Sequence, residues 1–180
     1  MLVRRAGKLS GFGHVHVVTS DGETGRVWFG AAPDLSGFEV RVPVDSFVVD
    51  EPAARAAAGP EFAATVPEEA RTGTRRNMLG PEVLDAARYP EIIVGSAGPL
   101  GDTAPSKLAV RIVVRGAQLE REVPVTVRIA ADSVSARGSF TILQSELGIK
   151  PFSIVGGAIA VADEVEVRFD IVARSVGSSR

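Results

Sequence analysis

Apolar and polar residues alternate along several stretches of this chain. Between Glu164 and Ile171, for example, valine, phenylalanine and isoleucine take every second position, and glutamate, arginine and aspartate take the others. This pattern is typical of antiparallel strands that cover a core with one face. Between turn residues, it predicts strands at residues 2–6, 10–19, 24–30, 37–48, 91–97, 106–116, 120–130, 133–143 and 163–174. Asp21-Gly22 predicts a hairpin between the second and third of these.

Residues 50–90 depart from the alternating pattern. They are rich in Ala, Glu and Arg and are interrupted by proline and glycine. Glu51–Ala58 is predicted to form a short helix. Thr65–Glu68 has the spacing of a capping box, which predicts a second helix that runs to about Leu79. Pro81–Arg88 is predicted to form a third helix, with the proline in its first turn.

The predicted fold is all-β, mainly antiparallel, in a single domain over residues 1–180 with a helical insertion near residues 50–90. Strands with one apolar face can form a two-sheet sandwich or close into a barrel. Closure removes exposed strand edges, and a barrel of about eight strands leaves room for one small ligand. We therefore favour the barrel. Pro43 and Pro124 fall at polar positions of the alternation, which indicates strand ends, edges or bulges.

Composition narrows the possible functions. The chain has 20 basic and 22 acidic residues and a pI near 5.8, so we expect no nucleic-acid partner. It has no cysteine, which excludes disulfides and thiol chemistry. No apolar run approaches the length of a membrane span. The N-terminus has basic residues but no apolar signal-peptide core, so either the protein is cytoplasmic or a leader was removed.

His14 and His16 are the only histidines. At i and i+2 on a strand, they share one face. They could contact a ligand or backbone at a barrel rim, or they could bind a metal with a carboxylate such as Asp45 or Glu146. The second possibility predicts a metal- or haem-associated redox accessory protein. No spacing in the chain supports a nucleophile, a phosphate loop or a dinucleotide site, so we expect no enzymatic activity.

Two further groups of residues could bind a ligand. Arg71, Arg75 and Arg76 form the densest basic cluster, which could hold a phosphate headgroup or form a solvated helix face. Several large apolar residues lie on or beside the predicted strands and in the helical insertion. In a sandwich these residues would form the core. In a barrel they would line a tunnel or cap its mouth, and they are Phe38, Phe47, Met78, Leu79, Phe140, Ile142, Phe152 and Phe169.

Four segments, in the expected order, resemble a known family. Residues 77–92, NMLGPEVLDAARYPEI, resemble the signature stretch of the YceI-like family, in which a short helix ending in Tyr-Pro leads into a strand. Residues 139–152 are similar to its second landmark, and residues 163–170 to its final strand. Residues 7–18 resemble the Gly-His-x-His opening of one branch. Asn77 stands where better-known members have His.

The resemblance implies a lipocalin-like barrel that binds a polyisoprenoid or similar long-chain amphiphile without catalysis or a cofactor. It also implies a bacterial transport protein that forms a homodimer and is periplasmic or secreted. Under this hypothesis the contacts to the ligand headgroup would come from His14, His16, Arg75, Arg76 and Asn77. An alternative is a dimeric interaction module whose barrel is filled by its own side chains.

Overall fold

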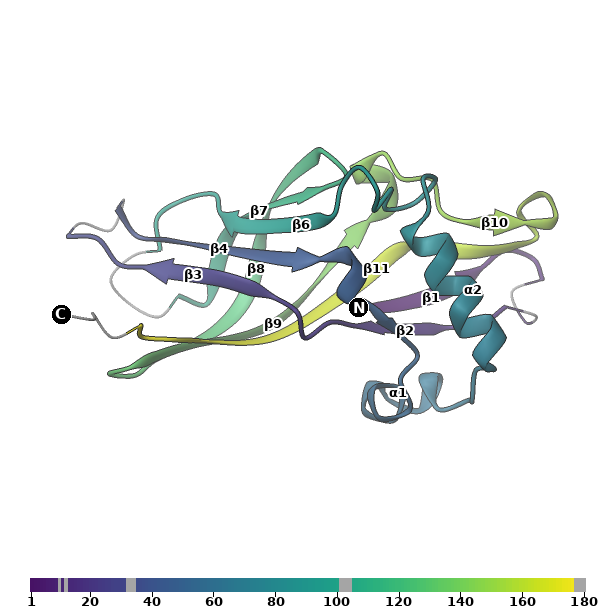
Figure 1. Ribbon diagram of the computed structural model, residues 1–180, viewed down its shortest axis with the longest axis horizontal. Helices are drawn as coiled ribbons and strands as arrows, with labels where there is room; N and C mark the ends of the chain where they lie inside the picture. Colours follow the sequence, from purple (N-terminus) through teal and green to yellow (C-terminus); the bar gives the residue numbers. More distant parts are fainter. Residues whose placement is uncertain (10, 12, 32–34, 101–104, 177–180) are drawn as a thin grey trace.

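The computed structural model describes residues 1–9, 11, 13–31, 35–100 and 105–176. It is mostly antiparallel β-structure with two α-helices, as the sequence predicted (Figure 1). The strands are β1 (Leu2–Ala6), β2 (His16–Thr19), β3 (Thr24–Trp28), β4 (Gly37–Pro43), β5 (Val48–Val49), β6 (Glu91–Ser96), β7 (Lys107–Val114), β8 (Ala117–Ile129), β9 (Ser133–Leu143), β10 (Ser153–Ile154) and β11 (Ile159–Arg174). The helices are α1 (Pro52–Ala58) and α2 (Glu68–Leu79), and short 3-10 helices include η3 (Val44–Ser46), η4 (Pro60–Phe62) and η5 (Gln144–Leu147).

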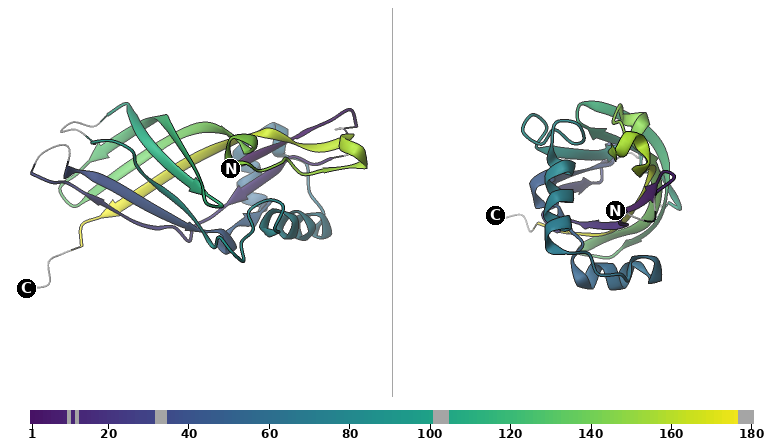
Figure 2. Two further views of the ribbon diagram at one scale, coloured as in Figure 1. Left: turned by 90° about the horizontal axis from the view of Figure 1, so that it is seen from above. Right: turned by 90° about the vertical axis from the view of Figure 1, so that its right-hand side faces the viewer.

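The strands curl into a ring, which is visible end-on in Figure 2. Hydrogen bonds connect them in the order β3-β4-β6-β7-β8-β9-β11-β1-β2-β5, and β10 pairs with β11. The chain runs from β2 into β3 and, through η3, from β4 into β5, so each of these runs forms one kinked strand. The two kinked strands pair with each other at both ends, β2 with β5 and β3 with β4. The predicted barrel of about eight strands is thus formed when each kinked pair is counted as one strand and the short β10, which lies off the main strand order, is left out.

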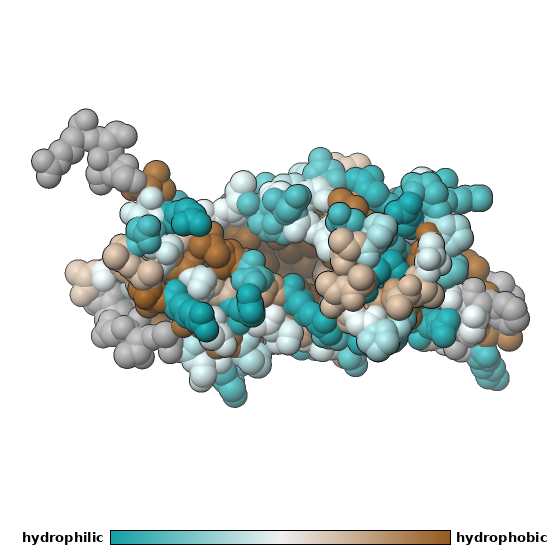
Figure 3. Space-filling model, turned by 90° about the horizontal axis from the view of Figure 1, so that it is seen from below, coloured by the Kyte–Doolittle hydropathy of each residue, from teal (hydrophilic) through white to brown (hydrophobic). Residues whose placement is uncertain are grey.

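The ring is closed at one end only. At the closed end, β1 pairs with β11 on one side and with β2 on the other. At the other end, within the described residues, β3 pairs only with β4, and residues 167–174 of β11 pair only with β9. A space-filling view from below shows a hollow with apolar surface inside it (Figure 3).

The helices lie outside the ring at the end that contains β1, β2 and β10 (Figures 1 and 2). Phe62, which follows α1, is buried against Leu2 and Val17 on the outer side of the strands. Met78 and Leu79 at the end of α2 pack against a second buried cluster, formed by Val18, Val44, Phe47 and Val49.

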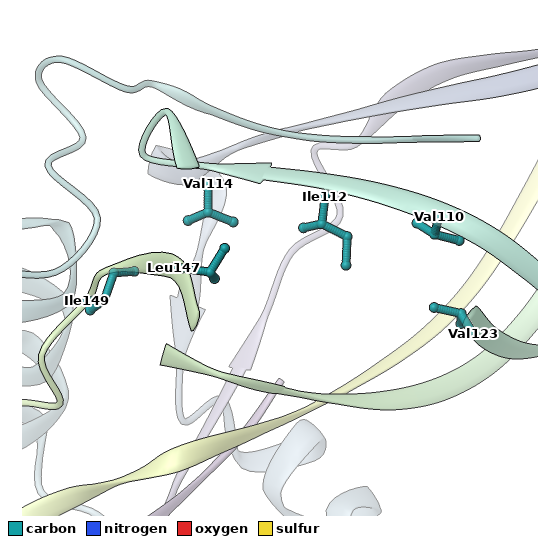
Figure 4. Close-up of a cluster of buried hydrophobic side chains, with 6 residues drawn as sticks. All are labelled: Val110, Ile112, Val114, Val123, Leu147 and Ile149. Carbon is teal, nitrogen blue, oxygen red and sulfur yellow. The ribbon is translucent and has the colours of Figure 1, made fainter. Parts of the chain in front are cut away.

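Apolar side chains fill the middle of the barrel. The largest buried cluster comes from β7, β8 and the η5 segment (Figure 4), and Phe38, Phe140 and Phe169 pack against it. Gly148 has a φ of +67°, a conformation that few residues other than glycine adopt easily. It reverses the chain after η5, so that both Leu147 and Ile149 point into this cluster.

The predicted hairpin at Asp21-Gly22 is wrong, because β2 pairs with β1 and β5 whereas β3 pairs with β4. This segment is instead the kink between β2 and β3, and it lies against the kink at η3. A Cβ on Gly22 would approach the Cβ of Ser46 to 2.8 Å. Glycine is therefore needed here for close approach rather than for a tight turn. Ser20 and Ser46 join the two kinks through a hydroxyl–hydroxyl hydrogen bond of 2.7 Å.

Other element predictions need smaller corrections. Residues 81–88 form turns instead of a third helix, because Asp85 has a φ of +48° that a right-handed helix cannot include. Helix α2 begins after Pro67 without a side-chain cap, so the capping box is absent. The predicted strand 37–48 breaks at η3, and Pro43 ends β4. The predicted strand 10–19 begins at His16, and its residues 10 and 12 lie outside the described residues.

Candidate functional site

An internal cavity of about 250 Å³ occupies the end of the barrel covered by α2. Most of its lining is aliphatic or aromatic, contributed by β1, β2, β6, β7, β9, β10, β11 and the helical insertion. Phe152 and Ile154 line the cavity and are also 39% and 47% exposed, so they mark its mouth. The apolar lining residues are Met1, Val3, Val18, Phe47, Met78, Val83, Leu84, Ile92, Val114, Ile142, Leu147, Ile149, Phe152, Ile154, Ile159, Ala160, Val161 and Val165.

The floor of the cavity is the surface of the packed core. Val114, Leu147 and Ile149 line the cavity and also belong to the buried cluster in Figure 4. The barrel therefore consists of a filled part and a hollow part that share these three side chains.

A polar cluster lies in the cavity wall. The lining includes His14, His16, Thr74 and Asn77, and the rings of the two histidines are 6.2 Å apart between centroids. The Nδ1 atom of His16 is 2.6 Å from a carboxylate oxygen of Asp50. Because an ionised carboxylate only accepts hydrogen bonds, Nδ1 carries the proton. This leaves the Nε2 atom of His16 facing Thr74, whose hydroxyl is 3.4 Å away.

Asp50 is held from three directions. Its other carboxylate oxygen accepts hydrogen bonds from the backbone N–H of Val17, at 2.8 Å, and from the Arg55 guanidinium, at 2.5 Å. Arg55 also donates to the carbonyls of Val15 and Ala64. The Asp50 side chain is completely buried, and that of Arg55 is 6% exposed. This network joins β2, the segment after β5, and α1.

Burial by itself would raise the pKa of Asp50. The hydrogen bonds from His16 and Val17 outweigh that effect and hold the pKa below its ordinary value. Asp50 is therefore a buried carboxylate that stays ionised and fixes the orientation of the His16 ring. This arrangement presents Nε2 of His16 to the cavity.

A second, polar cavity of about 340 Å³ adjoins the first. The two share Arg5, Gly13 and His14 in their linings. The rest of the second lining is Arg4, Val15, Arg55, Glu61 and Ala64. An apolar compartment is thus continuous with a charged one.

The predicted apolar lining residues divide into two groups. Phe47, Met78, Ile142 and Phe152 line the cavity. The others pack elsewhere: Phe38, Phe140 and Phe169 against the filled core, with a ring distance of 6.3 Å between the last two, and Leu79 against the Val44 cluster. Alternation along a strand predicts which side chains point into the barrel. It does not predict whether side chains fill the interior at that position along the barrel axis or leave a cavity there.

The predicted headgroup residues also divide. His14, His16 and Asn77 line the apolar cavity, whereas Arg75 donates hydrogen bonds to the backbone carbonyls of Asp45 and Phe47, at 2.7 and 3.0 Å. Arg76 is exposed and lines neither cavity.

Sequence reasoning missed Arg5, Asp50 and Arg55. An aspartate two residues before a helix that starts with proline, and an arginine within that helix, are ordinary surface signals. Only their burial beside His16 distinguishes them, and burial of this kind depends on which segments the barrel brings together.

The residues described by the structure contain no group of three or more His, Cys, Asp or Glu side chains that could hold a metal ion. The carboxylate beside His16 is Asp50, while Glu146 pairs with Arg121 at 2.7 Å. In the same residues, no helix is long and apolar enough to cross a membrane.

The fold and the cavity define a class of protein: a small antiparallel β-barrel with an apolar internal compartment. A family model described as the YceI-like domain matches residues 5–173. The chain therefore belongs to the YceI-like family, as its sequence motifs indicated.

Several solved structures share the fold. BcnA of Burkholderia cenocepacia is 19% identical, with a TM-score of 0.60 over 96% of this chain and 95% of that one. A polyisoprenoid binding domain from Saccharophagus degradans is 10% identical, with a TM-score of 0.63 over 97% and 92%. The YCEI protein of Campylobacter jejuni is 9% identical, with a TM-score of 0.60 over 89% and 85%. Comparison with curated proteins finds no match.

Proposed function

We propose that this protein binds the chain of a polyisoprenoid or similar long-chain amphiphile in its apolar cavity and carries or sequesters it without catalysis. The observation on which the proposal rests is the cavity itself, because folded domains normally fill such space with side chains. The name of the Saccharophagus degradans neighbour supports the ligand class.

The cavity volume sets the length of chain that can be enclosed. A volume of about 250 Å³ corresponds to roughly eight methylene-sized groups, if each takes about the volume of a water molecule. Burial of eight such groups contributes roughly 6 kcal/mol before the cost of ordering the chain. A longer polyisoprenoid would therefore extend past Phe152 and Ile154 at the mouth.

The proposal is tested by organic extraction and mass spectrometry of protein purified gently from its own host, beside an unrelated control protein. We expect a stoichiometric long-chain species that the control lacks. A protein that is empty and also fails to take up an added isoprenoid quinone would refute the proposal.

A matched pair of variants on β11 tests whether the cavity is the binding site. Val161 lines the cavity, whereas Val172, on the same strand, is 54% exposed. We expect Val161→Phe to lower ligand occupancy at least several-fold by occupying the space, and Val172→Phe to leave it unchanged. Circular dichroism checks that both variants fold. Equal occupancy in two folded variants would place the ligand elsewhere.

We further propose that the whole chain acts as one binding domain and that it forms a homodimer. The family resemblance supports both parts of this proposal. Sedimentation equilibrium with and without the extracted ligand measures whether the protein forms a homodimer.

A further inference from the structure

The two adjoining cavities differ in chemistry but share part of their walls. Arg5, Gly13 and His14 line both of them. The first cavity is mainly apolar, whereas the second includes three arginines and one glutamate. A molecule with an apolar tail and a polar head could occupy both compartments at once, with its head beside the shared residues.

The three arginines of the polar cavity differ in what they contact. Arg4 forms ion pairs with Glu61 at 3.2 Å and with Glu166 at 3.3 Å. Arg55 is paired with the buried carboxylate of Asp50.

Arg5 differs from the other two. Among the described residues, its guanidinium has a single polar contact, a hydrogen bond of 3.0 Å to the carbonyl of Gly13. No carboxylate in the part of the chain that the structure describes pairs with this guanidinium, which lies where the two cavities meet.

We infer that the ligand is an amphiphile with an anionic headgroup, a phosphate or a carboxylate, which binds Arg5 and His14 while its chain lies in the apolar cavity. This inference rests on the proposed function and names the headgroup class. A guanidinium donates several N–H groups in one plane, which suits the paired oxygens of these anions. The imidazole of His14 can add a further hydrogen bond.

Arg5 is exposed, so water and salt weaken its attraction for an anion. The effect should therefore be a preference among ligands rather than an absolute requirement. We expect the anionic amphiphile to bind about tenfold more tightly than the neutral one at low salt, and the ratio to fall at high salt.

The test compares farnesyl monophosphate with farnesol by isothermal titration calorimetry on the full chain. Arg5→Gln removes the charge but keeps a polar side chain, and His14→Ala removes the second contact. Arg128→Gln is the matched control, because Arg128 is an exposed strand residue that lines neither cavity. Inorganic phosphate is titrated separately.

We expect Arg5→Gln to weaken binding of farnesyl monophosphate much more than binding of farnesol, so that the preference for the phosphate is lost. His14→Ala should reduce the preference, and Arg128→Gln should retain it. Equal affinity for the two ligands in the native protein, or a preference that survives in Arg5→Gln, would overturn the inference and leave the proposed function intact. If neither ligand binds, the proposed function itself fails.

Inorganic phosphate distinguishes a lipid headgroup from a free anion. If phosphate binds in an Arg5-dependent way and farnesyl monophosphate gains nothing over farnesol, the site accepts a free anion and the inference is wrong. We expect inorganic phosphate to bind far more weakly than farnesyl monophosphate, because it lacks the buried chain.

Discussion

The filled and hollow parts of this barrel are held together by different interactions. In the filled part, Val110, Ile112 and Val123 of the neighbouring strands β7 and β8 belong to one buried cluster (Figure 4), and Phe38, Phe140 and Phe169 from other strands pack against it. In the hollow part, the strands enclose a cavity of about 250 Å³. The cavity interrupts packing across that interior, so bonds within the wall and packing outside it contribute more to holding the strands there.

The hollow part has two such supports. Inside the wall, Asp50 accepts a hydrogen bond from the N–H of Val17, and its own N–H donates to the Val17 carbonyl at 2.7 Å. Its carboxylate also pairs with His16 and Arg55. Outside the wall, Phe62 packs on the opposite face of the same strands. Where side chains leave a cavity, the wall is thus held by its own hydrogen bonds and ion pairs and by packing on its outer face.

The largest expected effect comes from breaking that wall. We expect Asp50→Asn to lower the free energy of unfolding by about 3–5 kcal/mol, because it leaves the buried guanidinium of Arg55 without its countercharge. Urea unfolding at neutral pH measures the loss. A loss below about 1 kcal/mol would mean that the helices outside the barrel support the hollow part without this network.

The same network predicts a pH dependence. The pKa of Asp50 is lowered in the folded protein, so its stabilising contribution is complete above the ordinary carboxyl pKa and is lost as the pH falls through the lower folded value. Between pH 5 and pH 2, approximately, native protein should therefore lose more stability than Asp50→Asn. Asp163 and Glu166 also have lowered pKa values, but they are present in both proteins. The free energy of unfolding of both proteins is measured as a function of pH, and parallel curves for the two would contradict this role of Asp50.

A second pair of variants compares the filled part of the barrel with the hollow part. Ile112 is 3% exposed in the filled part, whereas Ile154 is 47% exposed at the mouth of the cavity. We expect Ile112→Ala to cost about 3 kcal/mol, because it leaves a void in a packed region. Ile154→Ala should cost below about 1 kcal/mol and should instead weaken ligand binding. Thermal unfolding and ligand titration of both variants measure the two effects, and equal stability losses would argue against a hollow end.

The smallest effect is expected on the outer surface. Arg137 pairs with Asp170 across β9 and β11, and the two side chains are 75% and 56% exposed. An ion pair so exposed contributes at most about 0.5 kcal/mol, so the free energy of unfolding of Arg137→Ala should be almost that of the native protein. A loss of several kcal/mol would show that the filled part depends on surface charge as well as on packing.

Much of the fold could be predicted because alternation and turn residues are local signals. The run that ends at Ile171 predicted the last strand, although β11 begins earlier, at Ile159. The Asp21-Gly22 prediction failed because the same dipeptide also allows two kinks to approach closely, and only the contact with Ser46 distinguishes the two uses.

The candidate site was predictable in part. Spacing placed His14 and His16 on one face, and both line the cavity. Arg75 was a reasonable headgroup candidate from its charge, but the structure uses its guanidinium to bind the backbone carbonyls of Asp45 and Phe47. Arg5 stood outside the basic cluster in the sequence and yet lies where the two cavities meet.

The sequence by itself determined most of the long strands, the place of the helical insertion and the family, because periodicity and motifs are properties of neighbouring residues. The tertiary structure alone decided which inward side chains meet a core and which face a cavity. It also decided that Asp50, His16 and Arg55 share one buried network. Packing and burial depend on distances between segments that are far apart along the chain, and no local pattern records those distances.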